Sequence, residues 1–219
     1  MSEKAFGING FVLKCIAMIC MLIDHTGAVL FPQYLGLRMV GRLAFPIYCF
    51  LLVEGAMHTT NIRKYEQRLF LFALISEVPF DLAFYGGTSW AHQNVFFTLF
   101  LGVLAIDLAQ WIQNKLSVII IFFLMIIAAE LLHTDYGGSG IVFILCYYLL
   151  YEKKVLKQAM FVLENFFLYR VGVQLYASFA VVPMLLYNGK KGPSMKYLFY
   201  VFYPGHLLIL YLIVKFKFY

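Results

Sequence analysis

Residues Met18–Phe31 read MICMLIDHTGAVLF. Apolar side chains fill most of this stretch, as in a helix that crosses a bilayer, yet the adjacent Asp24 and His25 stand inside it. An ionisable side chain at membrane depth is costly and usually faces the interior of a helix bundle or a hydrated cavity. The stretch therefore predicts a membrane span whose polar pair faces other helices or water.

The composition of the whole chain agrees with a membrane protein. Hydrophobic residues make up 63% of the 219 residues and charged residues 13%, and the mean hydropathy is +0.83. A soluble domain is about half apolar and about a quarter charged. A soluble fold of this composition would leave large apolar patches on its surface. We therefore expect residues 1–219 to form a single all-α domain in the membrane.

The apolar runs and their breaks predict the individual helices. A helix needs about 20 apolar residues to cross the hydrocarbon core, and glycine, proline and polar clusters mark the connections. The predicted helices cover residues 11–31, 39–58, 67–85, 95–112, 116–132, 139–152, 155–168, 172–187 and 196–214. The segment 155–187 is too long for one crossing and short for two. We therefore expect a polytopic bundle of eight or nine transmembrane helices.

Basic residues give the expected orientation, because short cytoplasmic loops are enriched in Lys and Arg. With nine spans and a cytoplasmic N-terminus, the inner segments hold Lys4, Arg63, Lys64, Arg68, Lys115, Lys153, Lys154, Lys157, Lys190, Lys191 and Lys196. The outer segments hold Arg38, Arg170, Lys215 and Lys217. The net charge of +6 then reflects topology and affinity for anionic lipid headgroups rather than nucleic-acid binding. A multi-pass membrane protein with a cytoplasmic N-terminus is expected.

Helix geometry constrains what Asp24 and His25 do. Successive helical residues are about 100° apart, so these two side chains do not face each other. A group that orients His25 must therefore come from another helix. Glu77 and Asp81 are four residues apart and share a helix face. Asp24, His25 and His206 do not have the close sequence spacing that is typical of metal ligands, so no metal is predicted.

Structural readings of these residues stay open beside functional ones. A single histidine within a span is often a hydrogen-bonded packing residue, and this holds for His25 and for His206. Arg42 and an acid could form a buried pair that only fixes helix packing.

Six segments together resemble the TraX family, membrane proteins of conjugal transfer that are associated with N-terminal acetylation of pilin. These segments are LKCIAMICMLIDHTGAVLF (13–31), LRMVGRLAFPIYCFLLVEGAMHTTNIRKYEQRL (37–69), SEVPFDLA (76–83), NVFFTLFLG (94–102), DYGGSG (135–140) and YNGKKGPSMKYLFYVFYPGHLLIL (187–210). MLIDHTG followed by AFPIYCFLLVEG also resembles, more distantly, the His-bearing first helix and next helix of transmembrane acyltransferases.

The resemblance implies a multi-pass protein of the bacterial cytoplasmic membrane, an acyltransferase that moves an acetyl group from acetyl-CoA to a peptide amine or another polar acceptor. Histidine suits the role of base because its free pKa is about 6.5. His25 is the expected general base and His206 the second candidate, with Asp24, Glu77 or Asp81 positioning the site. Arg42 would neutralise carboxylates or polarise the carbonyl. The expected contacts to the CoA phosphates are Arg63, Lys64, Arg68, Lys190 and Lys191.

Two other functions fit the same residues. Acids, histidines and prolines within spans are also typical of a proton-coupled small-molecule transporter, although the sequence has no visible inverted repeat. A non-catalytic membrane assembly protein is the other alternative, and it predicts that loss of His25 leaves function intact.

Overall fold

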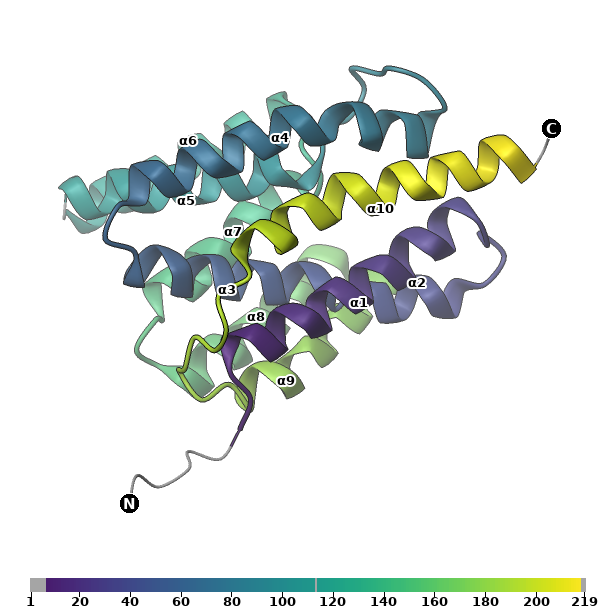
Figure 1. The fold of residues 1–219 in the computed structure, drawn as a ribbon. Coiled ribbons are helices and arrows are strands. Elements are labelled where there is room, and N and C mark those ends of the chain that lie inside the picture. Colours follow the sequence, from purple (N-terminus) through teal and green to yellow (C-terminus); the bar gives the residue numbers. More distant parts are fainter. Residues whose placement is uncertain (1–6, 113, 218–219) are drawn as a thin grey trace.

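The computed structural model describes residues 7–112 and 114–217, and these residues fold into helices joined by short connections (Figure 1). Lys4 lies outside the described residues. The elements are α1 (Gly10–Val29), α2 (Leu35–Gly41), α3 (Ala44–His58), α4 (Ile62–Tyr85), α5 (Val95–Ile112), α6 (Lys115–Leu131), α7 (Gly137–Leu149), α8 (Lys154–Tyr169), η1 (Val173–Ala180), α9 (Val181–Leu185) and α10 (Lys196–Lys217). Taken with α2–α3 and η1–α9 as continuous units, the described residues follow the nine predicted helices. The all-α fold is confirmed.

Most helix ends differ from the sequence prediction by a few residues, and three differences have a clear local reason. The predicted helix 39–58 breaks after Gly41. Pro46 has no N–H to donate to the Arg42 carbonyl four residues earlier, and its ring clashes with that carbonyl. The predicted helix 172–187 begins as a 3-10 helix, and Pro183 likewise disfavours an α-helical turn before it. α4 begins at Ile62 because the Asn61 side chain caps it, accepting from the Lys64 backbone N–H at 2.9 Å. The predicted inner loop 59–66 is therefore shorter.

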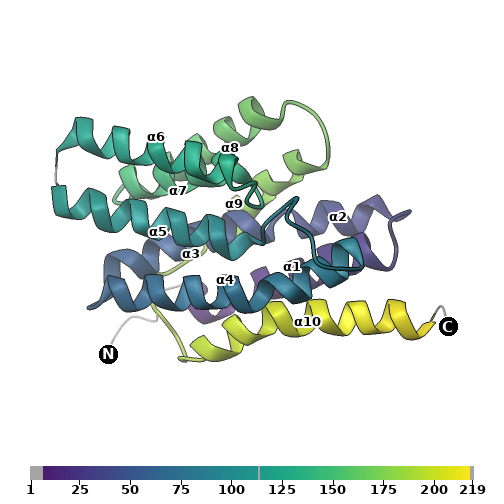
Figure 2. The same ribbon diagram turned by 90° about the horizontal axis from the view of Figure 1, so that it is seen from above.

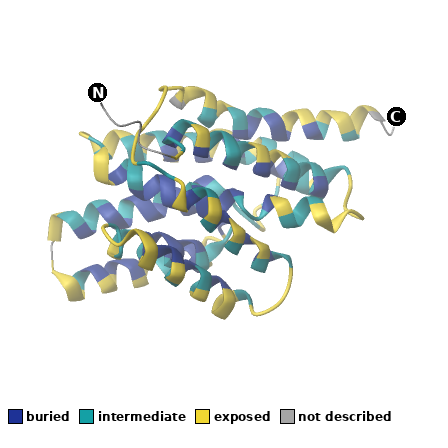
Figure 3. Cartoon of the chain, turned by 90° about the horizontal axis from the view of Figure 1, so that it is seen from below, coloured by how far each residue is buried: buried dark blue, intermediate teal, exposed yellow. Residues whose placement is uncertain are grey.

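Apolar side chains cover the outside of the bundle as well as its interior. Among the described residues, four helical segments are long and apolar enough to cross a membrane: Gly10–Val29, Leu35–His58, Val95–Ile112 and Tyr197–Phe216. On α4 and α6, exposed large side chains include Leu74, Val78, Ile120, Phe123 and Ile127. Figure 3 shows exposed residues on the outward faces of helices whose inward faces are buried. Such an outer surface fits hydrocarbon rather than water.

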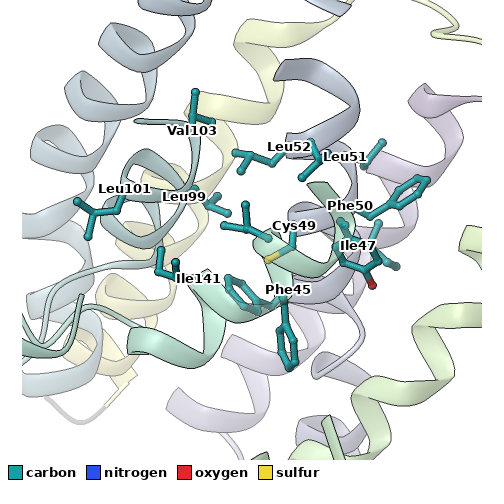
Figure 4. Close-up of a cluster of buried hydrophobic side chains, with 14 of the residues drawn as sticks. Phe45, Ile47, Cys49, Phe50, Leu51, Leu52, Leu99, Leu101, Val103 and Ile141 are labelled. Atoms are coloured by element: carbon teal, nitrogen blue, oxygen red, sulfur yellow. The ribbon is translucent and has the colours of Figure 1, made fainter. Parts of the chain in front are cut away.

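The centre of the bundle is α3, which packs against α1, α5, α7 and η1. Every residue from 44 to 53 except Tyr48 is buried. A helix that is apolar all round belongs inside a bundle. Figure 4 shows side chains of α3 meeting those of α5 and α7, with Phe45 and Cys49 near Leu99 and Ile141. A Cβ at Gly140 would lie 2.8 Å from the Phe45 ring, so glycine permits this close approach.

The connections gather at two ends of the bundle (Figures 1 and 2). At one end α1 begins, and the chain passes from α3 to α4, α5 to α6, α7 to α8 and α9 to α10. We call this the basic end, because it carries Arg63, Lys64, Lys115, Lys153, Lys154, Lys190 and Lys191. The opposite end carries the turns after α1, α4, α6 and α8. The enrichment of Lys and Arg predicts that the basic end faces the cytoplasm.

This orientation predicts opposite labelling of two exposed positions. In intact cells, a membrane-impermeant thiol reagent should label a cysteine introduced by Trp90→Cys at the opposite end, where Trp90 is 92% exposed. A cysteine introduced by Lys190→Cys at the basic end should react only after the cells are opened. The background for both variants is Cys15→Ser protein, because Cys15 is partly exposed whereas Cys20, Cys49 and Cys146 are buried. Labelling of both positions from the same side would contradict the alternating topology.

Candidate functional site

The carboxylate of Asp24 is buried between Arg38 of α2 and Arg42, the residue that follows α2. Arg38 Nη1 lies 2.6 Å from Asp24 Oδ2, and Arg42 Nη2 lies 2.5 Å from the same oxygen. Arg42 Nε also donates to Asp24 Oδ1 at 3.2 Å, which makes the contact bidentate. Gly41 allows the helices to meet here, since a Cβ at that position would overlap the Asp24 side chain. The sequence thus brings α1 and α2 together around one charge.

This cluster extends beyond the two helices. Arg42 Nη1 lies 3.5 Å from Gln174 Oε1 of η1, and its guanidinium lies 5.9 Å from the centre of the Tyr136 ring. Removing one partner of a buried ion pair leaves an uncompensated charge, which costs about 3–5 kcal/mol. The pair of Arg42 with an acid, left open by the sequence, is therefore present and joins α1, α2, η1 and the loop before α7.

His25 points away from Asp24 and meets a second helix. Its Nδ1 lies 2.7 Å from Nε2 of His206 on α10, and the two rings are nearly parallel, 4° apart. His206 Nδ1 in turn lies 2.7 Å from the carbonyl oxygen of Phe202. The sequence prediction that the partner of His25 comes from another helix is confirmed.

The Phe202 carbonyl assigns the hydrogens of this chain of contacts. A carbonyl oxygen only accepts, so Nδ1 of His206 carries the hydrogen and its Nε2 is the acceptor in the neutral ring. Nδ1 of His25 must then donate to that Nε2, which leaves the His25 Nε2 with a lone pair. Phe84 and Tyr203 pack edge-on against the His25 ring at 5.4 and 5.9 Å between ring centres. The geometry therefore presents a fixed, neutral imidazole with one free basic nitrogen.

Two cavities approach His25 from opposite ends of the bundle. The basic-end cavity has a volume of about 420 Å³ and extends from Met21 to His58, Thr59, Gly189 and Lys191. The His25 cavity has a volume of about 310 Å³ and extends from Met21, past His25, to Tyr85 and His92 at the opposite end. Four side chains line both cavities, so the two cavities adjoin at these residues, which we call the neck: Met21, Tyr48, Val95 and Tyr203.

The predicted CoA contacts divide into two groups. Arg68 and Lys191 line the basic-end cavity. Lys14, which lies on the same face of α1 as His25, also lines this cavity. Arg63, Lys64 and Lys190 lie at the same end but are not among the lining residues. Only part of the predicted basic set thus faces the space that leads to His25.

The predicted carboxylates on α4 lie outside both cavities. Glu77 Oε2 accepts from Asn94 Nδ2 at 2.5 Å and from its backbone N–H at 3.2 Å. Asp81 Oδ2 accepts from the Ser89 backbone N–H at 2.8 Å. Both side chains therefore hold the loop 86–94 to the end of α4, and neither lines the cavity around His25.

Several cavity residues were missed by sequence reasoning. Arg38 precedes Arg42 by four residues, and this spacing on one helix face could have predicted that both reach the same acid. Asp135 belongs to the DYGGSG segment, but only the fold brings it beside Tyr136 and His92 in the cavity that contains His25.

Comparisons with known proteins identify the family. The TraX protein family matches residues 9–214. The probable fimbrial assembly protein FimC, serogroup H1, of Dichelobacter nodosus is 33% identical, over 95% of this chain and 96% of the relative. The TraX protein of Escherichia coli is 24% identical, over 64% of this chain and 56% of the relative. No solved structure matches. The chain therefore belongs to the TraX family, and its apolar helices make it a multi-pass bacterial membrane protein.

Proposed function

We propose that this protein is a membrane acyltransferase that moves an acetyl group from acetyl-CoA to an amine or another polar acceptor, with His25 as general base. The observation that carries the proposal is the position of His25, beside the neck where two cavities from opposite ends of the bundle meet. Its free Nε2 and its support by His206 give it the geometry of a base that is oriented by a third group.

The basic-end cavity has the chemistry that an acyl-CoA needs. Lys14, Arg68 and Lys191 offer positive charge for phosphates toward the cytoplasmic side. Deeper in, the wall is apolar and aromatic, with Leu52 and Phe96 among its side chains. A narrow pantetheine arm fits such a wall while the nucleotide stays at the mouth, and the thioester then reaches the neck.

The transfer step follows from the hydrogen-bonded histidines. The acceptor nitrogen or oxygen attacks the thioester carbonyl carbon, and Nε2 of His25 takes the proton that it loses. The C–S bond then breaks, and the proton passes from His25 to the sulfur, which leaves as the CoA thiol. During the step Nδ1 of His25 keeps its hydrogen bond to His206, which stabilises the imidazolium. Arg38 and Arg42 line the same cavity and favour negative charge on the carbonyl oxygen.

Two cavities that open at opposite ends also suit a carrier, so the transporter is the second candidate. A carrier alternates access to one site between the two sides. It predicts coupled flux of a small molecule and no release of CoA. The name of the Dichelobacter nodosus relative favours a role in fimbrial assembly, which an acetyl transfer to a fimbrial subunit would also satisfy.

Replacement of His25 separates a base from a packing residue. We expect His25→Asn protein to fold and to bind acetyl-CoA, yet to lose transfer by about a hundred-fold or more, the usual size of a general-base contribution. The measurement is CoA release by purified protein in detergent with a panel of peptide amines and sugars. His133→Asn is the matched control, because His133 lies exposed in the loop before α7. Near-normal turnover in folded His25→Asn protein would exclude the assigned base.

The division of the basic residues predicts a difference between two double variants. Arg68→Gln with Lys191→Gln should weaken acetyl-CoA binding about tenfold or more, because each removes a charge from the cavity wall. Arg63→Gln with Lys64→Gln removes the same charge from the same end but not from that wall, so it should change the dissociation constant little. Isothermal titration with acetyl-CoA at one salt concentration measures both. Equal weakening by the two pairs would assign the effect to the general field of the basic end.

A further inference from the structure

We infer that a groove between α5, α6 and α7 at the basic end of the bundle is a binding site for an anionic phospholipid. The groove is separate from the two cavities beside His25, because none of its described lining residues is shared with them. The inference therefore does not depend on the proposed acyl transfer. It concerns a second ligand, which the surrounding membrane supplies.

The groove lies where a helical hairpin extends beyond its neighbours. Figures 1 and 2 show that the α5–α6 hairpin is the part of the bundle that reaches farthest at the basic end. Beside this hairpin α7 ends at Leu149, and the chain then turns toward α8. The groove between the three helices has a volume of about 730 Å³. This volume lies in the range of about 300–1,000 Å³ that is typical of ligand sites.

The lining of the groove combines hydrogen-bond donors with apolar side chains. The donors are Gln110 of α5, Lys115 of α6 and Tyr148 of α7, and Lys115 adds a positive charge. The apolar part of the wall includes Ile119 and Leu149, both of which are exposed on the outside of the bundle. Neither Asp nor Glu occurs among the described residues that line the groove. A ligand with one negative charge and an apolar portion therefore matches this wall.

Aromatic residues place the groove at the level of the lipid headgroups. Trp111 follows Gln110 in the last turn of α5 and is 83% exposed. Tyr148 lies in the last turn of α7 and lines the groove itself. Trp and Tyr are enriched where the hydrocarbon core of a bilayer meets water. The groove is thus positioned to hold a headgroup at the interface while its apolar wall faces hydrocarbon.

A phospholipid with a negative headgroup satisfies both parts of the wall. Its phosphate accepts from the Lys115 ammonium, which gives a charge-assisted hydrogen bond. The Gln110 amide nitrogen lies 3.5 Å from Met57 Sδ, a weak acceptor that a lipid ester oxygen can replace. The acyl chains cover Ile119 and Leu149, which a free phosphate would leave bare.

The orientation of the bundle favours an anionic lipid over a zwitterionic one. The enrichment of Lys and Arg places the basic end on the cytoplasmic side. Anionic lipids of the cytoplasmic leaflet attract Lys and Arg side chains near the membrane surface. A zwitterionic headgroup would bring a second cation close to Lys115, without a carboxylate in the groove to pair with it.

Native mass spectrometry of delipidated protein in detergent tests the site. Titration with dioleoyl phosphatidylglycerol or dioleoyl phosphatidylcholine counts the bound lipids and gives the Kd of the first one. We expect the first phosphatidylglycerol to bind about tenfold or more tightly than the first phosphatidylcholine, as one charge-assisted hydrogen bond allows. Lys115→Gln should remove most of this preference, and Lys115→Arg should keep it. Lys153→Gln is the matched control, because Lys153 is exposed at the same end but outside the groove lining.

Three results would overturn the inference. Equal Kd values of the two lipids in native protein would exclude an anion site, and this comparison needs no variant to fold. Equal effects of Lys115→Gln and Lys153→Gln would assign the preference to the overall charge of the basic end. Displacement of phosphatidylglycerol by excess glycerol 1-phosphate would show a site for free phosphate esters rather than for a lipid. None of these results bears on CoA release, which tests the acyltransferase separately.

Discussion

The carboxylate of Asp24 and the guanidinium groups of Arg38 and Arg42 form the interaction on which the site depends. A single charge at this depth would be costly, and three groups in direct contact satisfy one another. Because Arg42 also reaches Gln174, the cluster sets α2 and η1 against α1. With α1 fixed in this way, the next residue faces a different direction by about 100°. His25 consequently meets His206 on α10 and the cavity between them.

The side-by-side acid and imidazole therefore serve two different surfaces of one helix. Asp24 faces the arginines and holds helices together, while His25 faces α10 and the two cavities. Neither residue orients the other. The proposed chemistry uses this separation, because the base stays neutral and keeps a free lone pair while Asp24 and the two arginines bond to one another next to it.

Much of this arrangement could be predicted from the sequence, because periodicity and turn residues act locally. The helices, the central apolar run 44–53 and the need for a distant partner of His25 all follow from spacing. The cavity could not be predicted, since it depends on which helices pack together. Glu77 and Asp81 share a helix face as expected, but that face holds the loop 86–94. Asp135 joins the site only through hydrogen bonds between two loops.

In the proposed reaction, donor and acceptor meet at His25 from opposite sides of the membrane. The decisive experiment uses native protein reconstituted in vesicles with one orientation, with acetyl-labelled acetyl-CoA supplied only on the side of the basic end and triglycine amide only on the other. We expect labelled N-acetyl triglycine amide on the acceptor side and free CoA on the donor side. Transfer that occurs only when both substrates share one side would contradict it.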